Sequence, residues 1–144
     1  MEVRIKIVDG GTMPCRAHVD DAGFDCYART CELLTETMQV RYNLGFCIEI
    51  PEGHVGLVFP RSSVCRQDLQ LSNSVGVVDS GYRGEVSAVF NLVAIRGDEK
   101  IRMYDRGDRV AQLIIIPYPK VRLVESDTLS ETERGKGGYG STGR

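Results

Sequence analysis

The stretch "VRYNLGFCIEI", residues 40–50, is the clearest strand signal in the chain because an apolar side chain occupies every even position from Val40 to Ile50. The odd positions between them are mostly polar or small. Since successive side chains of a strand point to opposite faces, the alternation predicts a β-strand with one face in the core. The same alternation recurs in three other runs: Val3, Ile5 and Ile7; Val55, Leu57 and Phe59; and Val86, Ala88, Phe90 and Leu92.

Short turn sequences separate these runs. "VDGG", "PEGH", "DSGYRG", "IRGDEK" and "YDRGDR" each combine a glycine or proline with an acidic residue. Many short strands with such punctuation predict one all-β domain, an antiparallel sandwich or barrel. Residues 113–116 predict a fully buried strand that Pro117 and Pro119 terminate. A short helix is expected after "PRSS", where Ser62 or Ser63 could cap the first amides.

The composition is that of a single folded domain, with 144 residues, 26% charged residues and a formal net charge of −2. This balance indicates neither disorder nor a nucleic-acid partner. The five cysteines include no CxxC pair, which argues against a zinc cluster or a disulfide framework and predicts mostly small buried side chains in a reducing compartment. Without a cationic leader or a membrane-length apolar run, we expect a cytoplasmic protein with no membrane partner, or a nuclear or host-cytosolic one for a eukaryotic or viral source.

The stretch "GVVDSGYRGE", residues 76–85, places a carboxylate at the end of a strand. Val77 and Val78 have strand character, so Asp79 falls where the strand gives way to a turn at Ser80. The aspartate is either a turn former or, between apolar neighbours, a general base that takes a proton from water. Tyr82 would then present an aromatic face nearby.

The stretch "PRSSV", residues 60–64, offers the ingredients of an anion site. Arg61 supplies a guanidinium, Ser62 and Ser63 supply hydroxyls, and the expected helix start supplies amides. Phosphate is the natural ligand of such a set. A capped turn with an exposed arginine is the alternative interpretation.

The glycine-rich stretch "RGKGGYGSTGR", residues 134–144, lacks the GxxxxGK[ST] pattern of a P-loop. Its glycines allow successive amides to converge on an anion. Arg134 can add a bidentate charge and Tyr139 a flat ring that can stack on a base. Such a segment is either a disordered end or a lid that closes over a ligand and completes its phosphate contacts.

In order along the chain, "AGFDCYA", "PRSS", "GVVDSGYRGE", "GDRVAQL" and "RGKGGYGSTG" resemble the five ordered motifs of the trimeric deoxyuridine triphosphatases, or dUTPases. The resemblance implies a jelly-roll-like distorted β-barrel assembled as a homotrimer, with each active site built from pieces of all the subunits. It also implies a barrel domain over residues 1–133 and a flexible arm, residues 134–144, that closes over the site.

The activity implied by this resemblance is hydrolysis of dUTP to dUMP and pyrophosphate, which limits uracil incorporation into DNA and supplies dUMP for dTTP synthesis. Asp79 matches the general base, and Tyr82 matches the ring beneath the deoxyribose that leaves no space for a 2′-hydroxyl. Asp25 matches an aspartate associated with Mg²⁺ through waters; the triphosphate mainly holds the metal, so no direct protein ligand is expected. The other matches are Asn73, Gly76, Val77 and Val78 for uracil; Arg61, Ser62, Ser63 and Gln112 for the phosphates; and Arg134, Tyr139, Gly140, Ser141 and Thr142 in the arm.

Two departures and two alternatives accompany the resemblance. Ser63 stands where many members have glycine, and Tyr139 where many have phenylalanine. The first alternative is a dCTP deaminase of the same superfamily, which "RSSVCR" partly resembles; its chemistry needs a glutamate where this chain has Val89, an aliphatic residue that cannot carry protons. The second alternative is a nucleotide-binding regulatory protein without catalysis.

Overall fold

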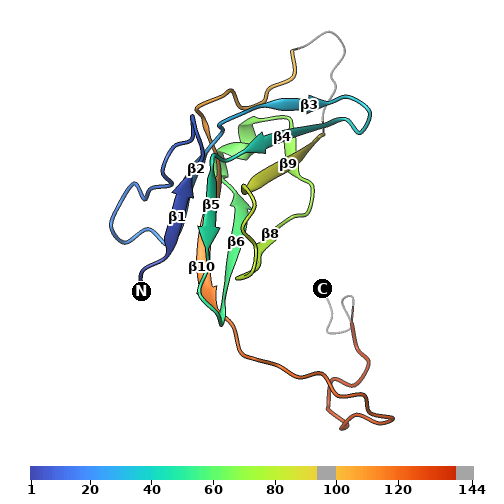
Figure 1. The fold of residues 1–144 in the computed structure, drawn as a ribbon. Coiled ribbons are helices and arrows are strands. Elements are labelled where there is room, and N and C mark those ends of the chain that lie inside the picture. Colours follow the sequence, from blue (N-terminus) through green and yellow to red (C-terminus); the bar gives the residue numbers. More distant parts are fainter. Residues whose placement is uncertain (94–99, 139–144) are drawn as a thin grey trace.

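The structure is a computed structural model that describes residues 1–93 and 100–138, and within them it contains ten strands and one short helix (Figure 1). The expected all-β class is confirmed. The strands are β1 (Arg4–Ile7), β2 (Phe24–Tyr27), β3 (Glu32–Leu34), β4 (Gln39–Asn43), β5 (Phe46–Glu49), β6 (His54–Pro60), β7 (Leu69–Leu71), β8 (Gly76–Val78), β9 (Ser87–Leu92) and β10 (Arg109–Pro117), with the helix η1 (Ser62–Arg66) between β6 and β7.

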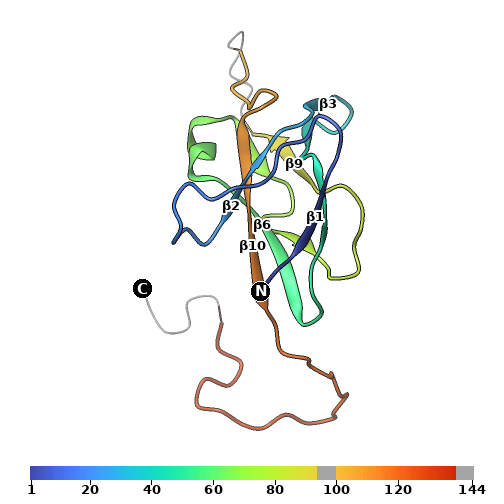
Figure 2. The same cartoon turned by 60° about the vertical axis from the view of Figure 1, so that its left-hand side comes forward.

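Three antiparallel sheets share the strands (Figures 1 and 2). One four-stranded sheet has the order β2-β10-β6-β8, the other has the order β3-β4-β9-β7, and β1 pairs with β5 in a two-stranded ribbon. Buried side chains from all three sheets form one core cluster. At its centre the rings of Tyr42, Phe90 and Tyr104 pack edge to face, with centroids 5.8–6.4 Å apart.

Residues 40–50 serve two sheets rather than forming one strand. Val40 and Tyr42 lie in β4, whereas Phe46 lies in β5 and pairs with β1. Between them Gly45 has a φ of +77°, a left-handed conformation that glycine adopts without strain. All six apolar side chains of the stretch are buried. The predicted core face is therefore confirmed, and the expectation of a single strand is wrong because the chain bends at Gly45.

The alternating run of Val55, Leu57 and Phe59 lies in β6, but these side chains face away from the core. Its Gly56 and Val58 point inward, while Val55, Leu57 and Phe59 are half-buried on the opposite face. At this inward position a Cβ would collide with Ile50, so a residue larger than glycine would force the neighbouring side chain to shift. The alternation thus predicted the strand and not which of its faces meets the core.

The predicted strand over residues 113–116 is part of β10, and its complete burial is wrong for this single chain. Leu113 is buried, but the side chain of Ile116 is 39% exposed. The register places Ile114 and Ile116 opposite residues of β6 on the outward face of the sheet. We call the outward side chains of Val55, Leu57, Val77, Ile114 and Ile116 the outer apolar strip.

The expected short helix is present, but it is a 3₁₀-helix. It begins at Ser62, its N-cap is Arg61, and no side chain bonds to its first amides. The expected serine cap is therefore wrong.

The cysteines differ from expectation as well, because of the five only Cys26 is buried. Burial raises the pKa of the Cys26 thiol to about 12, so this group is an unreactive core residue. Cys15, Cys31 and Cys65 are exposed, and Cys47 is half-buried.

Beyond β10 the chain leaves the barrel. Figures 1 and 2 both show residues 118–138 running away from the sheets. Leu123 and Leu129 are 92% and 89% exposed, and Val121 and Val124 are also exposed. Across residues 1–93 and 100–138, no helix is long and apolar enough to cross a membrane.

Candidate active site

A cavity of about 360 Å³ opens where β2, β10 and the start of η1 meet. The strand register explains the meeting, because Gln112 pairs with Asp25 on one side and with Phe59 on the other. Arg61 follows β6 two residues after Phe59. The cavity is lined by four of the predicted site residues, Asp25, Arg61, Ser62 and Gln112, together with Asp21 and Arg109.

Asp25 holds the two guanidinium groups of this cavity. Arg61 donates from Nε to Oδ1 at 2.7 Å and from Nη2 to Oδ2 at 3.3 Å, and Arg109 donates from Nη1 to Oδ2 at 3.0 Å. The Asp25 side chain is only 14% exposed, so these charge-assisted bonds are partly shielded from water. The guanidinium of Arg61 is therefore oriented before any anion arrives.

Ser63 does not share this cavity. Its Oγ lies 2.9 Å from the Tyr104 hydroxyl and 3.5 Å from Arg61 Nη1. The serine thus ties the start of η1 to the aromatic core, which gives the hydroxyl a structural use at a position where many of the dUTPases that the chain resembles have glycine. In this structure Ser62 lines the cavity and Ser63 supports it.

A second cavity, of about 200 Å³, lies along β8. Its lining includes all the residues predicted to read uracil, Asn73, Gly76, Val77 and Val78, and also Asp79 and Tyr82. Because β8 is an edge strand, part of its backbone is free of ladder hydrogen bonds and can meet the edge of a base. The strand ends at Val78, so Asp79 sits at the strand end as predicted, and its side chain is exposed.

Tyr82 is held against the loop that follows Asp79. Its amide donates to the Asp79 carbonyl at 3.0 Å, and its hydroxyl donates to the Glu85 carbonyl at 3.0 Å. A Cβ at position 84 would collide with the phenol, so Gly84 is needed for this packing. Tyr82 lines the second cavity and is 45% exposed.

Glu85 ties the same loop to the barrel. Arg29 donates from Nε to Oε1 and from Nη2 to Oε2, both at 2.8 Å, and the Gly45 amide donates to Oε1 at 3.0 Å. The hydrogen bonds from Arg29 lower the pKa of Glu85 below its ordinary range; burial works against them and the Gly45 amide adds to them. The carboxylate is therefore charged whenever the protein is near neutral pH.

Glu85→Gln is expected to lower the Tm by a few degrees at pH 7, because the amide nitrogen would face the Arg29 donors. The folded-state pKa of Glu85 lies below its ordinary value of about 4.3. The ion pair therefore contributes its full stabilisation of the folded state above that ordinary pKa, and the contribution is lost as the pH falls through the lowered pKa. Thermal unfolding of both proteins from pH 7 to pH 3 should show the Tm difference shrinking below about pH 4. A difference that stays constant over this range would contradict the assignment.

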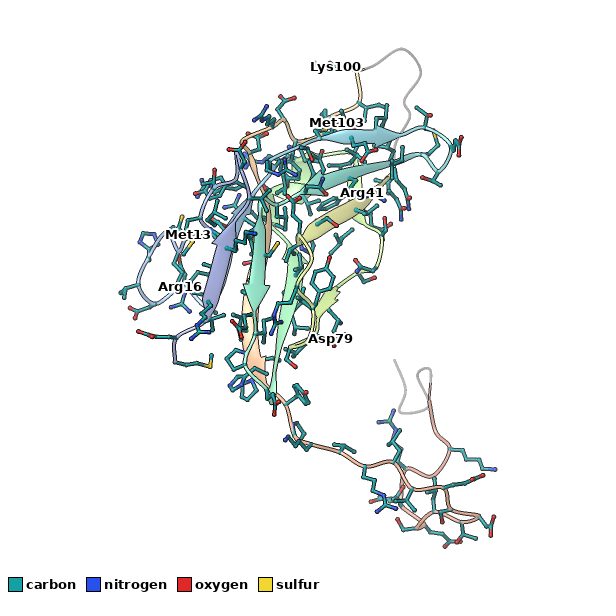
Figure 3. The ribbon with its side chains drawn as sticks, viewed as in Figure 1. Met13, Arg16, Arg41, Asp79, Lys100 and Met103 are labelled. Atoms are coloured by element: carbon teal, nitrogen blue, oxygen red, sulfur yellow. The ribbon has the colours of Figure 1, made fainter. Side chains whose placement is uncertain are left out.

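Asp79 and Arg61, one from each cavity, lie toward opposite ends of β6. Val78 pairs with Gly56, which places Asp79 alongside Val55, whereas Arg61 follows the other end of the strand. The six residue-to-residue steps from Val55 to Arg61 span about 20 Å of extended chain. Figure 3 agrees, since Asp79 lies at the end of the barrel from which the C-terminal segment departs. Asp79 and Arg61 of one chain are therefore too far apart to contact the same phosphate group.

Of the predicted arm residues, Arg134 lies within the described part of the chain. It is exposed, and its Nε donates to the Gly137 carbonyl at 3.0 Å. The others, Tyr139, Gly140, Ser141 and Thr142, lie outside the described residues.

The sequence analysis missed four contributors: Asp21, Arg29, Glu85 and Arg109. Arg109 stands in "GDRVAQL" three residues before Gln112, so its presence in the same motif was an available signal. Arg29 and Glu85 lie 56 residues apart, and nothing in their local sequence pairs them.

The same family emerges from comparison with known proteins. A family model described as dUTPase matches residues 9–143. The deoxyuridine 5'-triphosphate nucleotidohydrolase of Corynebacterium efficiens is 41% identical over 144 residues, covering 99% of this chain and 78% of that protein. The protein of that name from Mycobacterium leprae (strain Br4923) is 40% identical over 146 residues, covering 96% and 92%.

Solved structures agree with these relatives. The Staphylococcus bacteriophage 80alpha dUTPase with dUpNHpp is 27% identical, with a TM-score of 0.83 and 99% of both chains covered. A mutant dUTPase from phage phi11 of S. aureus, described with a coordinated structural Mg(II) ion, is 25% identical, with a TM-score of 0.74 and coverage of 89% and 98%. The jelly-roll-like β fold is thereby confirmed. Since the family match extends over nearly the whole chain and its motifs line both cavities, this chain belongs to the dUTPase family.

Proposed function

We propose that this protein hydrolyses dUTP to dUMP and pyrophosphate, acting as a dUTP diphosphatase. The observation that carries the proposal is the presence, on one chain, of an arginine-lined cavity suited to phosphates and a backbone-lined pocket that ends at a carboxylate. The curated relatives bear the name of this activity, and a solved relative holds a dUTP analogue. In a cell the reaction would limit uracil in DNA and supply dUMP for dTTP synthesis.

The reaction needs a base next to the α-phosphorus. Asp79, exposed at the end of β8, accepts a proton from water, and the resulting hydroxide attacks the α-phosphorus as pyrophosphate leaves. Backbone groups of β8 hold uracil, and a pocket of fixed amides and carbonyls penalises a base that leaves them unpaired. Tyr82 lies beneath the deoxyribose.

The phosphates and Mg²⁺ fit the first cavity. Arg61, Arg109 and Ser62 supply donors to phosphate oxygens, and the carboxylates of Asp21 and Asp25 balance the guanidinium charge. Within residues 1–93 and 100–138, no three His, Cys, Asp or Glu side chains gather as a ligand cluster. The two carboxylates of this cavity, Asp21 and Asp25, suit Mg²⁺ that arrives with the triphosphate and keeps most of its waters. The bound ion would neutralise charge on the phosphate oxygens, and Asp25 would contact it through water.

We infer that the active form is a homotrimer whose sites are shared between subunits. About 20 Å along β6 separates Asp79 from Arg61 in one chain, so a site that uses both residues is completed by bringing Asp79 of one copy to Arg61 of another. The outer apolar strip lies between these two positions and gives the copies an apolar surface to bury. The exposed aliphatic residues of 118–133 can pack on a neighbouring copy as the chain carries the arm across.

Residues 134–144 act in this scheme as the closing arm of the barrel domain 1–133. The Arg134 guanidinium and the hydroxyls of Ser141 and Thr142 take the γ-phosphate, with amides such as that of Gly140 beside them. Tyr139 stacks on uracil. Closure of such a segment excludes water and completes the charge around the phosphates.

Mixed trimers test the shared site. Asp79→Asn and Arg61→Ala are each expected to be nearly inactive alone, but random 1:1 co-assembly should restore about a quarter of wild-type turnover, because every mixed trimer holds one site with both residues intact. Refolding the two variants together and apart, followed by pyrophosphate release, measures this. Equal inactivity of the mixture, with mixing verified by mass spectrometry, would mean that each site lies within one chain.

A substrate panel tests the reaction. We expect purified protein with Mg²⁺ to release pyrophosphate from dUTP and to act far more slowly on dTTP, dCTP and UTP. Conversion of dCTP to dUTP would support the deaminase alternative, which Val89 disfavours because the strand β9 offers an aliphatic side chain there. Tight binding of intact dUTP would support the regulatory alternative. We place the enzyme in the cytoplasm, where nucleotide pools are made.

A further inference from the structure

We propose that Arg29 and Glu85 form a clamp that positions Tyr82, and that this clamp sets how strongly the enzyme favours deoxyribose over ribose. The inference deepens the proposed function and rests on it. Neither residue touches the second cavity, so both are positioning residues rather than catalytic ones.

The clamp is anchored in the rigid part of the barrel. Arg29 follows β2 closely, and its amide donates to the Asn43 carbonyl at the end of β4 at 2.8 Å. Gly45 lies at the bend between β4 and β5. The Glu85 carboxylate thus receives three hydrogen bonds of 2.8–3.0 Å from two segments that the sheets already hold. The side chains of Arg29 and Glu85 are 22% and 23% exposed, so water competes weakly for the pair.

The backbone carbonyl of Glu85 connects the clamp to Tyr82. The Tyr82 hydroxyl donates to the Glu85 carbonyl, so the position of that carbonyl sets the far end of the ring. Residues 81–84 between them are exposed. Arg83 also donates to the Tyr82 carbonyl, at 2.8 Å, but its side chain is 53% exposed and holds the backbone rather than the ring.

The position of the Tyr82 ring matters because ribose differs from deoxyribose by a single oxygen atom at the 2′ position. A pocket rejects one extra atom only if its wall cannot retreat, and a phenol bonded to a fixed carbonyl is such a wall. When the clamp is broken, the Val86 amide still donates to the Phe46 carbonyl at 2.9 Å, but the Glu85 side chain no longer holds the loop, so Glu85 and the ring bonded to it can move together. Ribose is then tolerated better, while the cavity lined by Asp25 and Arg61 is unchanged.

The decisive measurement is the ratio of kcat/KM for dUTP to that for UTP. We expect Glu85→Gln to lower this ratio about tenfold. Arg29→Lys keeps the charge but loses the bidentate geometry, and it should lower the ratio less than Glu85→Gln does. The matched control is Glu32→Gln, which breaks the exposed ion pair between Glu32 and Arg41 at 3.6 Å and should leave the ratio unchanged.

Tyr82→Phe shows whether the effect passes through the ring. The substitution removes the hydroxyl that bonds to the Glu85 carbonyl, so it should lower the ratio by itself, and adding Glu85→Gln should lower it little further. Additive losses would overturn the proposal. So would a Glu85→Gln protein with a reduced Tm and an unchanged ratio, since the clamp would then serve stability alone. If the wild-type protein does not hydrolyse dUTP, the proposed function itself fails, which is a separate outcome.

Discussion

Asp79→Asn is expected to reduce dUTP turnover by about 10²–10⁴-fold while leaving the affinity for dUTP largely unchanged. The amide is nearly isosteric with the carboxylate, so β8 and the pocket beside it should keep their shape, but the amide cannot accept a proton from water at neutral pH. Steady-state turnover together with equilibrium binding of a non-hydrolysable dUTP analogue measures both quantities.

The control for this variant is Glu36→Gln, a carboxylate-to-amide change in the turn between β3 and β4, which should leave turnover intact. Equal losses of turnover and affinity in Asp79→Asn would show that the side chain binds substrate instead of activating water. Unchanged turnover would move the base elsewhere, because Asp79 is the carboxylate that lines the second cavity.

Truncation after Glu133 is expected to leave the barrel and its assembly intact and to reduce turnover by about 10²-fold or more. The ten strands end at Pro117, so the removed residues contribute nothing to the described sheets. Without them the phosphates lose the charge of Arg134 and the amides of the glycines. Circular dichroism, light scattering and pyrophosphate release report on the fold, the assembly and the turnover.

A second truncation, after Gly138, divides the arm. It keeps Arg134 and its bond to the Gly137 carbonyl but removes Tyr139 and the hydroxyl residues. An intermediate turnover would assign separate contributions to the two halves of the arm. A fully active truncation after Glu133 would refute the closing role.

The fold class was predictable because the strand signals are local. The alternation from Val40 to Ile50 and that from Val86 to Leu92 each identified a buried face correctly. The predictions that were wrong concerned features that depend on contacts between segments far apart in the sequence. Complete burial of residues 113–116 depends on what covers the outward face of β10, and a continuous strand over residues 40–50 depends on a bend at Gly45 that lets one stretch serve two sheets.

For the candidate site too, the residues within local motifs were predictable and the contacts between distant segments were not. Asp25, Arg61, Ser62 and Gln112 were identified from ordered motifs, and the structure gathers them around one cavity. The hydrogen bond between the Ser63 and Tyr104 hydroxyls could not be predicted, since the two residues lie 41 positions apart in the sequence.

Strand positions, turns and the order of the motifs were thus encoded in the amino-acid sequence, because alternation and turn chemistry depend on neighbours along the chain. Folding in three dimensions established the rest: that Asp25 grips Arg61, that Arg29 clamps Glu85, and that Asp79 lies about 20 Å along β6 from Arg61. Those relations follow from the register between distant strands, and register is set by the packing of the whole core rather than by any one segment.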